Sequence, residues 1–272
     1  QSRFWVLVIS VSAKQSWFSW HNGTKDMSDN QFLKKLIPSP VRKYLRKVRD
    51  KKVAQEFSGL SNAEVFEKIY EEKRWGNSDI ENRKYSSGDG TRDKEVVGEY
   101  IDAVTGFLSK QEGLKSGLDL GCGDFSVGVA FCDLFQDYQA MDVAKNVIKE
   151  NKTIYKSKKV RFSVLDLTSG QIPSTDVILV RQVLQHLSND EIKKFIKNIE
   201  GKFRHLIVTE SLSKSMFFKS NKDINTGPGI RIHEKSGVVL EDNPFNLKFS
   251  KMDVIMEVAK GRELFVTKVY SV

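Results

Sequence analysis

The chain has 272 residues, of which 39% are hydrophobic and 29% charged, a composition typical of a globular protein. No window approaches the roughly 18 uncharged apolar residues that a membrane-spanning helix needs, so we expect none. The net charge of +9 leaves nucleic acid, an anionic membrane surface and acidic substrates open as partners. The two cysteines, Cys122 and Cys132, lack the spacing of a metal site, and we expect reduced thiols in a cytoplasmic protein.

The positive charge is concentrated in one segment. Residues 34–52 contain nine Lys or Arg and one acidic residue, whereas the remainder is close to balanced, which makes nucleic acid an unlikely partner. Apolar residues of this segment follow a helical spacing: Val41, Tyr44, Leu45 and Val48. Two interpretations stay open. The helix binds peripherally to an anionic membrane surface, or it is a solvated helix that packs its apolar stripe on the rest of the protein.

Three regions are expected along the chain. Residues 1–33 show no sustained period and are expected to be poorly ordered or foreign to the fold. Residues 34–58 form the basic amphipathic segment, and residues 59–272 form the main domain, which begins with a helical cap over residues 59–110.

The cap contains two helical patterns and a polar loop. Ser61-Asn62-Ala63-Glu64 is a capping box that predicts a helix to about Arg74. The loop that follows includes Ser86-Ser87-Gly88-Asp89-Gly90-Thr91, which we interpret either as a wall or flap over a ligand or as a flexible linker. A second helix is expected over residues 93–108.

After Gly117 the pattern alternates between strands and helices, which is typical of a parallel sheet with crossover helices. A helix is expected from Ser126 to Phe135, and a second capping box, Ser188 to Glu191, begins another. The last two strands are joined by a short turn and must be antiparallel. We therefore predict an α/β fold with helices on both faces of a mostly parallel, seven-stranded sheet that has an antiparallel terminal strand. The expected strands are 117–120, 139–143, 160–165, 176–180, 205–209, 251–258 and 263–270.

The candidate ligand site begins at the first strand, in Gly117-Leu118-Asp119-Leu120-Gly121-Cys122-Gly123-Asp124. Glycine permits a sharp turn and close approach of a ligand to the backbone. Because the carboxyl ends of parallel strands line one crevice, Asp142, Asp166 and Arg181 are expected to lie near this turn. A carboxylate about 20 residues beyond the turn suits a ribose diol, and Asp142 has that position. The alternative for Asp142 and Asp166 is a helix cap or turn residue.

Acidic residues flank the glycines on both sides. Asp119 and Asp124 would repel a pyrophosphate, and the stretch lacks the spacing of a dinucleotide fingerprint. Two carboxylates suit a ligand with a cationic amino group and no phosphate, such as S-adenosylmethionine. Phe125 stands where a third glycine is common in such turns, and the sequence gives no reason for it.

This stretch resembles the glycine-rich motif of the class I S-adenosylmethionine-dependent methyltransferases. The similarity extends through Trp75-Gly76, the Ser87-Gly88-Asp89-Gly90 loop, Val180-Arg-Gln-Val-Leu-Gln-His-Leu187 and Asn243-Pro-Phe245. It covers roughly residues 61–272 and points to a bacterial branch with mostly unassigned acceptors. The resemblance implies a Rossmann-like fold and S-adenosyl-L-methionine as cofactor.

The resemblance also implies roles for individual residues. Gly121 and Gly123 would contact the amino acid part of the cofactor, Asp142 its ribose and Asp166 its adenine. Asp119 would face the amino group. The whole set expected at the cofactor is Asp119, Gly121, Cys122, Gly123, Asp142, Val143, Asp166, Leu167 and Arg181.

The acceptor side is expected beyond the fourth strand. His186 is a candidate general base, since an unperturbed histidine pKa of roughly 6.5 suits proton abstraction at neutral pH; the alternative is a structural histidine. His233 is a second candidate base. Arg231 is placed to bind a carboxylate or phosphate, or it is a surface arginine. The expected substrate-binding residues are Trp75, Gln182, Asn225 and Arg231.

The favoured function is methylation of a sugar hydroxyl in a glycan or lipid-linked precursor, or of another small hydroxyl or acidic acceptor. No Asn-Pro-Pro-Tyr motif is present, which disfavours methylation of base amino groups, and no metal ligand set is visible. The alternatives are an RNA methyltransferase and a cofactor-binding partner protein without catalysis. We expect a cytoplasmic protein that contacts the membrane surface through residues 34–52; the oligomeric state is unknown at this point.

Overall fold

The computed structural model describes residues 38–78, 83–91 and 93–272, so the predictions for residues 1–33 lie outside the described residues. The chain divides into two compact units, Gln1–Lys52 and Val53–Val272. The predicted basic helix is present as α3 (Ser39–Glu56). In the described part of the chain, no helix is long and apolar enough to cross a membrane.

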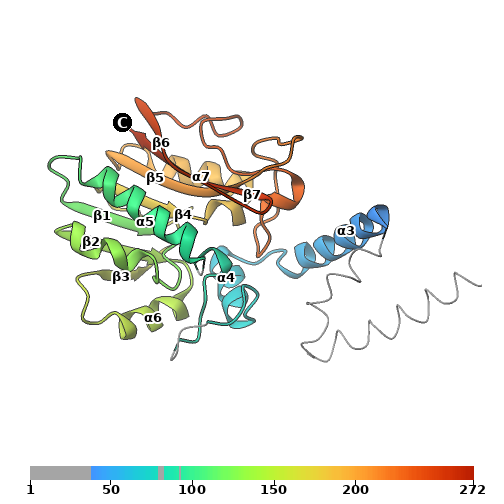
Figure 1. Cartoon of the computed structure of the whole chain (residues 1–272). Coiled ribbons are helices and arrows are strands. Elements are labelled where there is room, and N and C mark those ends of the chain that lie inside the picture. The colour runs from blue at the N-terminus through green and yellow to red at the C-terminus, as the bar shows by residue number, and fades with distance from the viewer. Residues whose placement is uncertain (1–37, 79–82, 92) are drawn as a thin grey trace, which may run out of the picture. The chain divides into compact units, whose positions relative to one another are not determined.

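The unit Val53–Val272 is built on one seven-stranded sheet with the order β3-β2-β1-β4-β5-β7-β6 (Figure 1). Strands β1 to β5 run parallel to one another. Strand β7 runs antiparallel to both of its neighbours, β5 and β6. This confirms the predicted mostly parallel sheet with an antiparallel terminal strand. The strands are β1 (Ser116–Leu120), β2 (Asp137–Asp142), β3 (Arg161–Val164), β4 (Val177–Arg181), β5 (His205–Ser213), β6 (Lys251–Lys260) and β7 (Glu263–Ser271).

The helices begin where the sequence predicts them. Ser61 and Glu64 form the expected capping box at α4, and the Ser188 side chain caps α7 by accepting from the Glu191 amide. The α-helices of this unit are α4 (Asn62–Glu71), α5 (Lys94–Leu108), α6 (Lys145–Ile154) and α7 (Asn189–Ile199). Four short 3₁₀ helices complete the elements: η1 (Asp89–Thr91), η2 (Gly128–Leu134), η3 (Leu184–His186) and η4 (Arg231–Glu234).

One element differs from its prediction. The segment after the glycine turn was expected to be a regular helix from Ser126 to Phe135, but it is the 3₁₀ helix η2. The chain enters it from Phe125, whose φ is +59°, and the Ser126 amide and hydroxyl both bond to the Asp124 carboxylate. These local bonds occupy the start of the segment and delay the helix by two residues.

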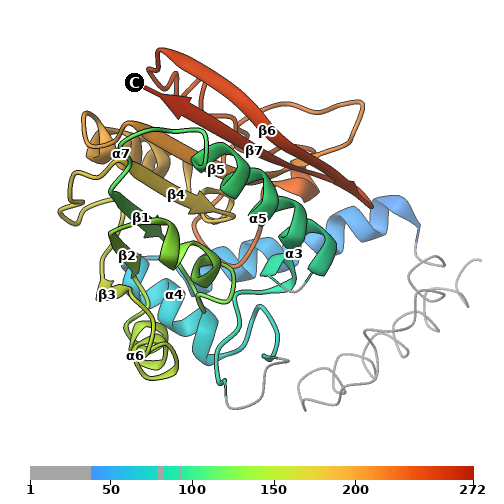
Figure 2. The same ribbon diagram turned by 60° about the vertical axis from the view of Figure 1, so that its left-hand side comes forward.

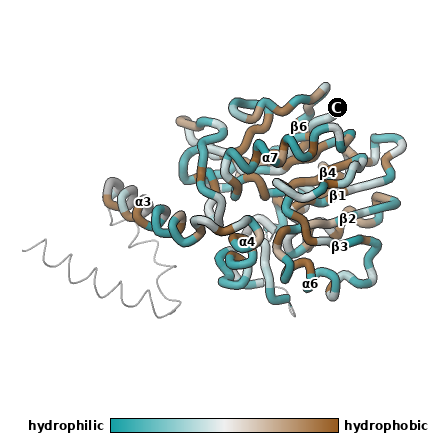
Figure 3. Tube along the Cα trace, turned by 180° about the vertical axis from the view of Figure 1, so that it is seen from behind, coloured by the Kyte–Doolittle hydropathy of each residue, from teal (hydrophilic) through white to brown (hydrophobic). Residues whose placement is uncertain are grey.

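The two faces of the sheet carry separate hydrophobic cores, because successive side chains of a strand point to opposite faces. On β4, Ile178 and Val180 pack in the core that includes α4 and α7, whereas Val177 and Leu179 pack in the core that includes α5 and η2. Helix α5 covers one face and α7 the other (Figure 1 and Figure 2). Hydrophobic residues are concentrated on the central strands (Figure 3). Helices therefore cover both faces, as predicted.

The strand order reverses between β1 and β4, which are neighbours although β2 and β3 lie between them in the sequence. In open parallel sheets the loops leave such a point in opposite directions and open a crevice at the carboxyl ends of the strands. The fold therefore places the ends of β1, β2 and β4 around one site.

Candidate functional site

The turn after β1 is built for close backbone approach. Gly121 and Gly123 have φ of +73° and +52°, a region that residues with a side chain rarely adopt. A Cβ on Gly121 would lie 2.5 Å from Val183, and one on Gly123 would lie 2.2 Å from the Ser87 hydroxyl. The amides of Gly121 and Cys122 both donate to the Met141 carbonyl, which fixes the turn on β2.

Phe125 belongs to the core under this turn. Its side chain is 1% exposed, and its ring makes T-shaped contacts with those of Tyr155 and Phe162, with ring centres 5.1 and 4.9 Å apart. A positive φ is uncommon for a bulky residue, and here the buried aromatic contacts compensate for its cost. Phe125 thus replaces glycine in conformation and adds an anchor below the turn.

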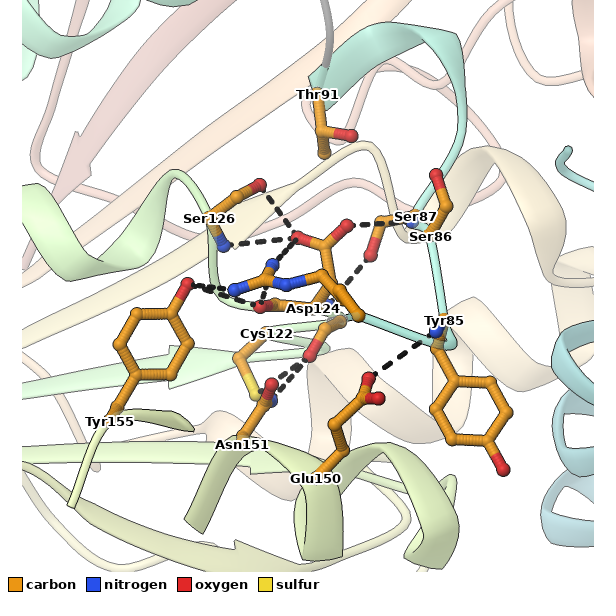
Figure 4. A network of polar contacts seen from close by, with 12 residues as sticks. Tyr85, Ser86, Ser87, Thr91, Cys122, Asp124, Ser126, Glu150, Asn151 and Tyr155 are labelled. Atoms are coloured by element: carbon orange, nitrogen blue, oxygen red, sulfur yellow. Dashed lines mark hydrogen bonds and ion pairs between the residues drawn. The ribbon is translucent and has the colours of Figure 1, made fainter. Parts of the chain in front are cut away.

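Asp124 does not serve the ligand in the way that the sequence suggested. Its carboxylate pairs with Arg83, with Nη1 and Oδ1 3.4 Å apart, and accepts from the Ser87 amide at 2.9 Å (Figure 4). In return, the Ser87 hydroxyl accepts from the Asp124 amide at 2.7 Å. Ser126 occupies the other oxygen. The charge of Asp124 is therefore neutralised by Arg83, and its bonds fasten the loop of residues 86–91 to the glycine turn.

Asp119 remains as the carboxylate at the centre of the cleft. It lies one residue before the end of β1, is 8% exposed, and has its Oδ2 so close to Gly128 that a Cβ there would lie 2.3 Å away. The pKa of Asp119 is raised to about 7, mainly by burial and also by the charge of Asp142, while the Arg181 guanidinium acts in the opposite direction. Asp119 is therefore poised to become fully ionised when a cation binds beside it.

Asp142 and Asp166 lie at the ends of the next two strands, and both also hold backbone. The Asp142 carboxylate accepts from the amides of Gly123 and Ala144, each at 2.9 Å. Asp166 accepts from the Thr168 amide at 2.8 Å and from the Asn62 side chain at 3.2 Å. The two interpretations from the sequence are compatible, because a carboxylate oxygen that accepts one bond can accept another.

Arg181 lies opposite these acids. Its Nη2 donates to the Gly90 carbonyl at 2.6 Å, and its guanidinium lies 5.1 Å from the centre of the Tyr100 ring. The guanidinium thus ties the end of β4 to the loop of residues 86–91. Since Ser87 and Thr91 of that loop line the cleft, the loop is a wall of the site.

These residues surround one cleft, with about 990 Å³ of empty space when the open solvent at its mouth is included. All nine residues expected at the cofactor line it. Trp75, Gln182 and His186 line it as well, whereas Asn225, Arg231 and His233 are outside its lining.

Arg231 is the clearest correction. Its side chain is 1% exposed and donates to the carbonyls of Leu184 at 2.9 Å and Leu187 at 2.7 Å. It also reaches the Lys222 carbonyl and the Asn189 side chain. A guanidinium whose donors are used in this way is not available to grip a substrate anion, so the expected substrate role was wrong. Arg231 instead stabilises η3 and the residue after it by bonding to their carbonyls.

Asn225 and His233 are corrected for a different reason. Both side chains are exposed and lie on the segment of residues 225–233 away from the cleft. This segment approaches the site through its backbone instead: the Pro228 carbonyl accepts from the Trp75 indole at 3.3 Å, and the Gly229 carbonyl contacts the His186 ring. It therefore positions acceptor-side residues without contributing its own side chains.

His186 is held as a neutral imidazole. Its Nδ1 lies 3.0 Å from the Gly229 carbonyl, which can only accept, so Nδ1 carries the proton and Nε2 the lone pair. The pKa of His186 is lowered to about 4, mainly by burial and also by the charge of Arg231, while backbone groups of Gly229 and Gly227 act in the opposite direction. The ring lies 4.8 Å from that of Trp75, which also lines the cleft.

Glu210 is a functional residue that the sequence analysis missed. It is buried on β5, and its carboxylate accepts from the amides of Leu184 at 2.8 Å and Gln185 at 3.1 Å. Glu210 and Arg231 thus hold the amides and carbonyls of η3, the segment that carries His186. The available signal was an acid that follows the apolar run of residues 206–208 in this strand. Arg83 and Tyr100 were not predicted as site residues, and Ser87 was predicted only as part of the loop of residues 86–91.

Comparison with known proteins agrees with this architecture. Residues 118–204 match a family model described as a methyltransferase domain, and this range includes every residue expected at the cofactor. No curated protein sequence matches the chain significantly.

Solved structures share the fold at low identity. The magnesium protoporphyrin IX methyltransferase of Synechocystis PCC 6803, solved with bound S-adenosylmethionine, has a TM-score of 0.50 at 15% identity, with 79% of this chain and 99% of that one covered. A methyltransferase from Clostridium acetobutylicum ATCC 824 has a TM-score of 0.46 at 13% identity, covering 64% of this chain and 92% of that one. The N-methyltransferase NodS from Bradyrhizobium japonicum WM9 has a TM-score of 0.49 at 13% identity, covering 66% and 98%.

Proposed function

We propose that this chain is a class I S-adenosylmethionine-dependent methyltransferase and that it methylates a hydroxyl oxygen of a sugar in a glycan or in a lipid-linked precursor; the match of residues 118–204 to a methyltransferase domain supports the proposal. The observation that carries the proposal is the composition of the cleft lining. The aspartates suit the cofactor, whereas Trp75, Gln182 and His186 add an indole, a carboxamide and a neutral imidazole, with the rings of Trp75 and His186 4.8 Å apart.

The acidic end fits S-adenosylmethionine. Gly121 and Gly123 leave room that a Cβ would fill, so the turn can face an amino acid moiety directly. Asp119 would hold the ammonium group, Asp142 the ribose hydroxyls and Asp166 the adenine amine. When bound, the cofactor supplies a methyl group on a sulfonium, which is already a good leaving group. The protein then mainly has to orient the acceptor and remove its proton.

The charge of the cleft favours a neutral acceptor. Among the described residues that line it, four are aspartates, of which Asp124 is paired with Arg83, and one is an arginine, Arg181, whose guanidinium is bonded to Gly90. A phosphate, a carboxylate or an RNA backbone would therefore meet mostly negative charge. This argues against the RNA acceptor and against acidic acceptors.

The uncharged end suits a sugar ring. Trp75 offers an aromatic face on which the C–H groups of a pyranose can pack, while polar groups beside it can bond to hydroxyls. Gln182 lies there in a fixed position, since its Nε2 donates to the Ser211 hydroxyl at 3.2 Å. An acceptor hydroxyl beside His186 can pass its proton to Nε2 while its oxygen becomes methylated. His186 is neutral throughout the physiological pH range, so its Nε2 lone pair can accept that proton, but its pKa of about 4 makes it a weaker base than the unperturbed histidine that the sequence analysis assumed.

Calorimetry tests the cofactor end. Asp142→Ala should weaken S-adenosylmethionine binding by about tenfold or more, the usual effect of losing hydrogen bonds to a charged group. Asp137→Ala is the matched control, because Asp137 begins the same strand, β2, on the opposite side of the sheet from the cleft. Equal affinity of Asp142→Ala and the control would refute the assignment of the cofactor site.

Labelled-methyl transfer tests the acceptor. The panel should contain free sugars, oligosaccharides, lipid-linked sugars, small hydroxy acids and RNA. Sugar O-methylation gives an ether that survives mild alkali, whereas methylation of a carboxylate gives an ester that alkali cleaves. Transfer to a sugar with an alkali-stable product supports the proposal. Transfer only to RNA or to an acid would overturn it, and cofactor binding without any transfer would favour the non-catalytic alternative.

His186→Gln tests the proton-accepting role. We expect a fall in kcat of about 10²-fold or more, with S-adenosylmethionine affinity within twofold of wild type. His233→Gln is the control, since His233 is exposed outside the cleft. A kcat for His186→Gln close to that of His233→Gln would leave His186 with a structural role only.

A further inference from the structure

The loop that follows β5 carries three consecutive large apolar side chains at its tip. Met216 is 89% exposed, Phe217 68% and Phe218 38%. Single exposed apolar residues are ordinary on protein surfaces, but adjacent ones that form a patch mark sites of interaction. We call Met216–Phe218 the apolar tip.

The apolar tip is held in place by hydrogen bonds. The Phe218 amide donates to the Ser215 carbonyl at 2.9 Å, which closes a turn. Next to it, the Lys219 amide donates to the Lys235 carbonyl at 3.1 Å, and the Ser236 hydroxyl donates to the Lys219 carbonyl at 2.6 Å. The fold thus presents these side chains to solvent from a fixed turn that is anchored on residues 235–236.

Cations surround the apolar tip. Lys214 and Lys219 flank it in the sequence, and the Lys235 ammonium lies 4.7 Å from the centre of the Phe217 ring. The Lys214 amide donates to the Arg262 carbonyl at 2.9 Å, so the turn between β6 and β7 lies next to the start of the loop that carries the apolar tip. The charged residues of these segments are Lys214, Lys219, Lys235, Arg262, Glu234 and Glu263, so cations outnumber acids.

We propose that the apolar tip docks on an anionic lipid bilayer, with Met216 and Phe217 inserted among the acyl chains and the flanking cations at the headgroups. We choose a lipid bilayer as the partner because of charge complementarity. The apolar tip with lysines beside it matches a surface on which apolar chains lie under negative headgroups. This interaction goes beyond methyl transfer and does not depend on the acceptor.

The position of the tip is consistent with access to a membrane-bound substrate. Strands β4 and β5 are parallel, and Arg181 at the end of β4 pairs with Thr209. Strand β5 continues four residues farther, to Ser213, before the loop begins. The tip therefore leaves the same edge of the sheet as the cleft. The basic and apolar residues of the segment 34–52 remain a separate proposal for membrane contact.

Vesicle co-sedimentation tests the proposal with the full chain. The probes are vesicles of phosphatidylcholine alone and of phosphatidylcholine mixed with phosphatidylglycerol. Wild type should bind the mixed vesicles. The variant Met216→Ser/Phe217→Ser should bind them about tenfold or more weakly, a change of 1.4 kcal/mol per factor of ten. Val254→Ser, which removes an exposed apolar side chain on β6, should bind like wild type.

Charge is tested separately. Lys214→Glu/Lys219→Glu should lower binding by about fivefold or more per lysine. Lys149→Glu/Lys152→Glu on α6 makes the same change in net charge and should have a smaller effect. In a third measurement, Phe217→Trp should keep binding and gain emission that brominated lipids quench.

Three results would overturn the proposal. They are equal vesicle binding by the Met216→Ser/Phe217→Ser variant and wild type, absence of quenching for Phe217→Trp, and a monomer-to-dimer change that follows the tip variants without vesicles. The last result would identify a second copy of the chain as the occupant. Circular dichroism and S-adenosylmethionine affinity, both unchanged in the tip variants, would show that the fold and the cofactor site are intact.

Discussion

The buried carboxyl of Asp119 should give cofactor binding a pH dependence near neutrality. Its pKa is raised to about 7, so roughly half of the free protein carries a protonated Asp119 at that pH. A bound ammonium group favours the carboxylate, so affinity should rise as pH increases. One-proton linkage predicts that S-adenosylmethionine binds about fivefold more tightly at pH 7 than at pH 6. Below about pH 7.7 the ligand's amino group stays protonated and does not reverse the trend.

Calorimetry at several pH values measures this slope, and Asp119→Asn should abolish it while weakening binding at neutral pH. The same substitution should stabilise the ligand-free protein. The folded pKa lies above the unfolded value, so the charged form costs stability that grows as pH rises from about 4 to 7. That cost is at most about 4 kcal/mol at pH 7. A flat affinity profile for wild type would refute the reasoning. An unchanged slope in Asp119→Asn would assign the proton to another group, such as Asp142, whose pKa burial also raises.

Three further changes follow from contacts near the site. Gly128→Ala places a Cβ 2.3 Å from the Asp119 carboxylate and should reduce S-adenosylmethionine affinity at least tenfold by calorimetry, whereas Gly106→Ala, with open space around it, should not. Arg231→Met removes the donors that bond to buried carbonyls and should lower the free energy of unfolding by about 3–5 kcal/mol in urea denaturation; a loss below about 1 kcal/mol would contradict the support of η3. Arg83→Met should destabilise by a similar amount, and combining it with Asp124→Asn should recover part of the loss; strict additivity in the double-mutant cycle would contradict the ion pair.

The sequence predicted what depends on local pattern. The alternation of apolar strands with capped helices led to the sheet and its antiparallel end, because period and capping residues are properties of neighbouring residues. The acidic lining of the cleft could be predicted for a related reason. Asp119, Asp142 and Asp166 each lie at or within two residues of the carboxyl end of a strand, and the topology of a parallel sheet brings such ends together without further information.

The acceptor side could not be predicted in the same way. Arg231 lies in a glycine-rich segment that suggested an exposed loop, yet its donors are used by carbonyls of η3 more than 40 residues away. His233 is two positions farther and is exposed. Which of these side chains turns inward is decided by long-range hydrogen bonds to the backbone, and these leave no periodic signal in the sequence.

The two carboxylates beside the glycine turn show why a charge pattern alone is not a binding site. In the sequence, Asp119 and Asp124 look equivalent, and both were expected to favour a cationic ligand. In the fold, Asp124 has a cation of its own, Arg83, and hydrogen bonds to the Ser87 backbone. Its role is therefore mechanical: it joins the wall of the cleft to the turn that meets the cofactor. No ion pair like that between Arg83 and Asp124 is recorded for Asp119 among the described residues. Burial leaves Asp119 with a raised pKa that a bound ammonium group can lower. Under the proposed function, the affinity for the cofactor would depend on Asp119, whose charge is costly without the ligand, next to a turn that Asp124 fastens with a charge already compensated by Arg83.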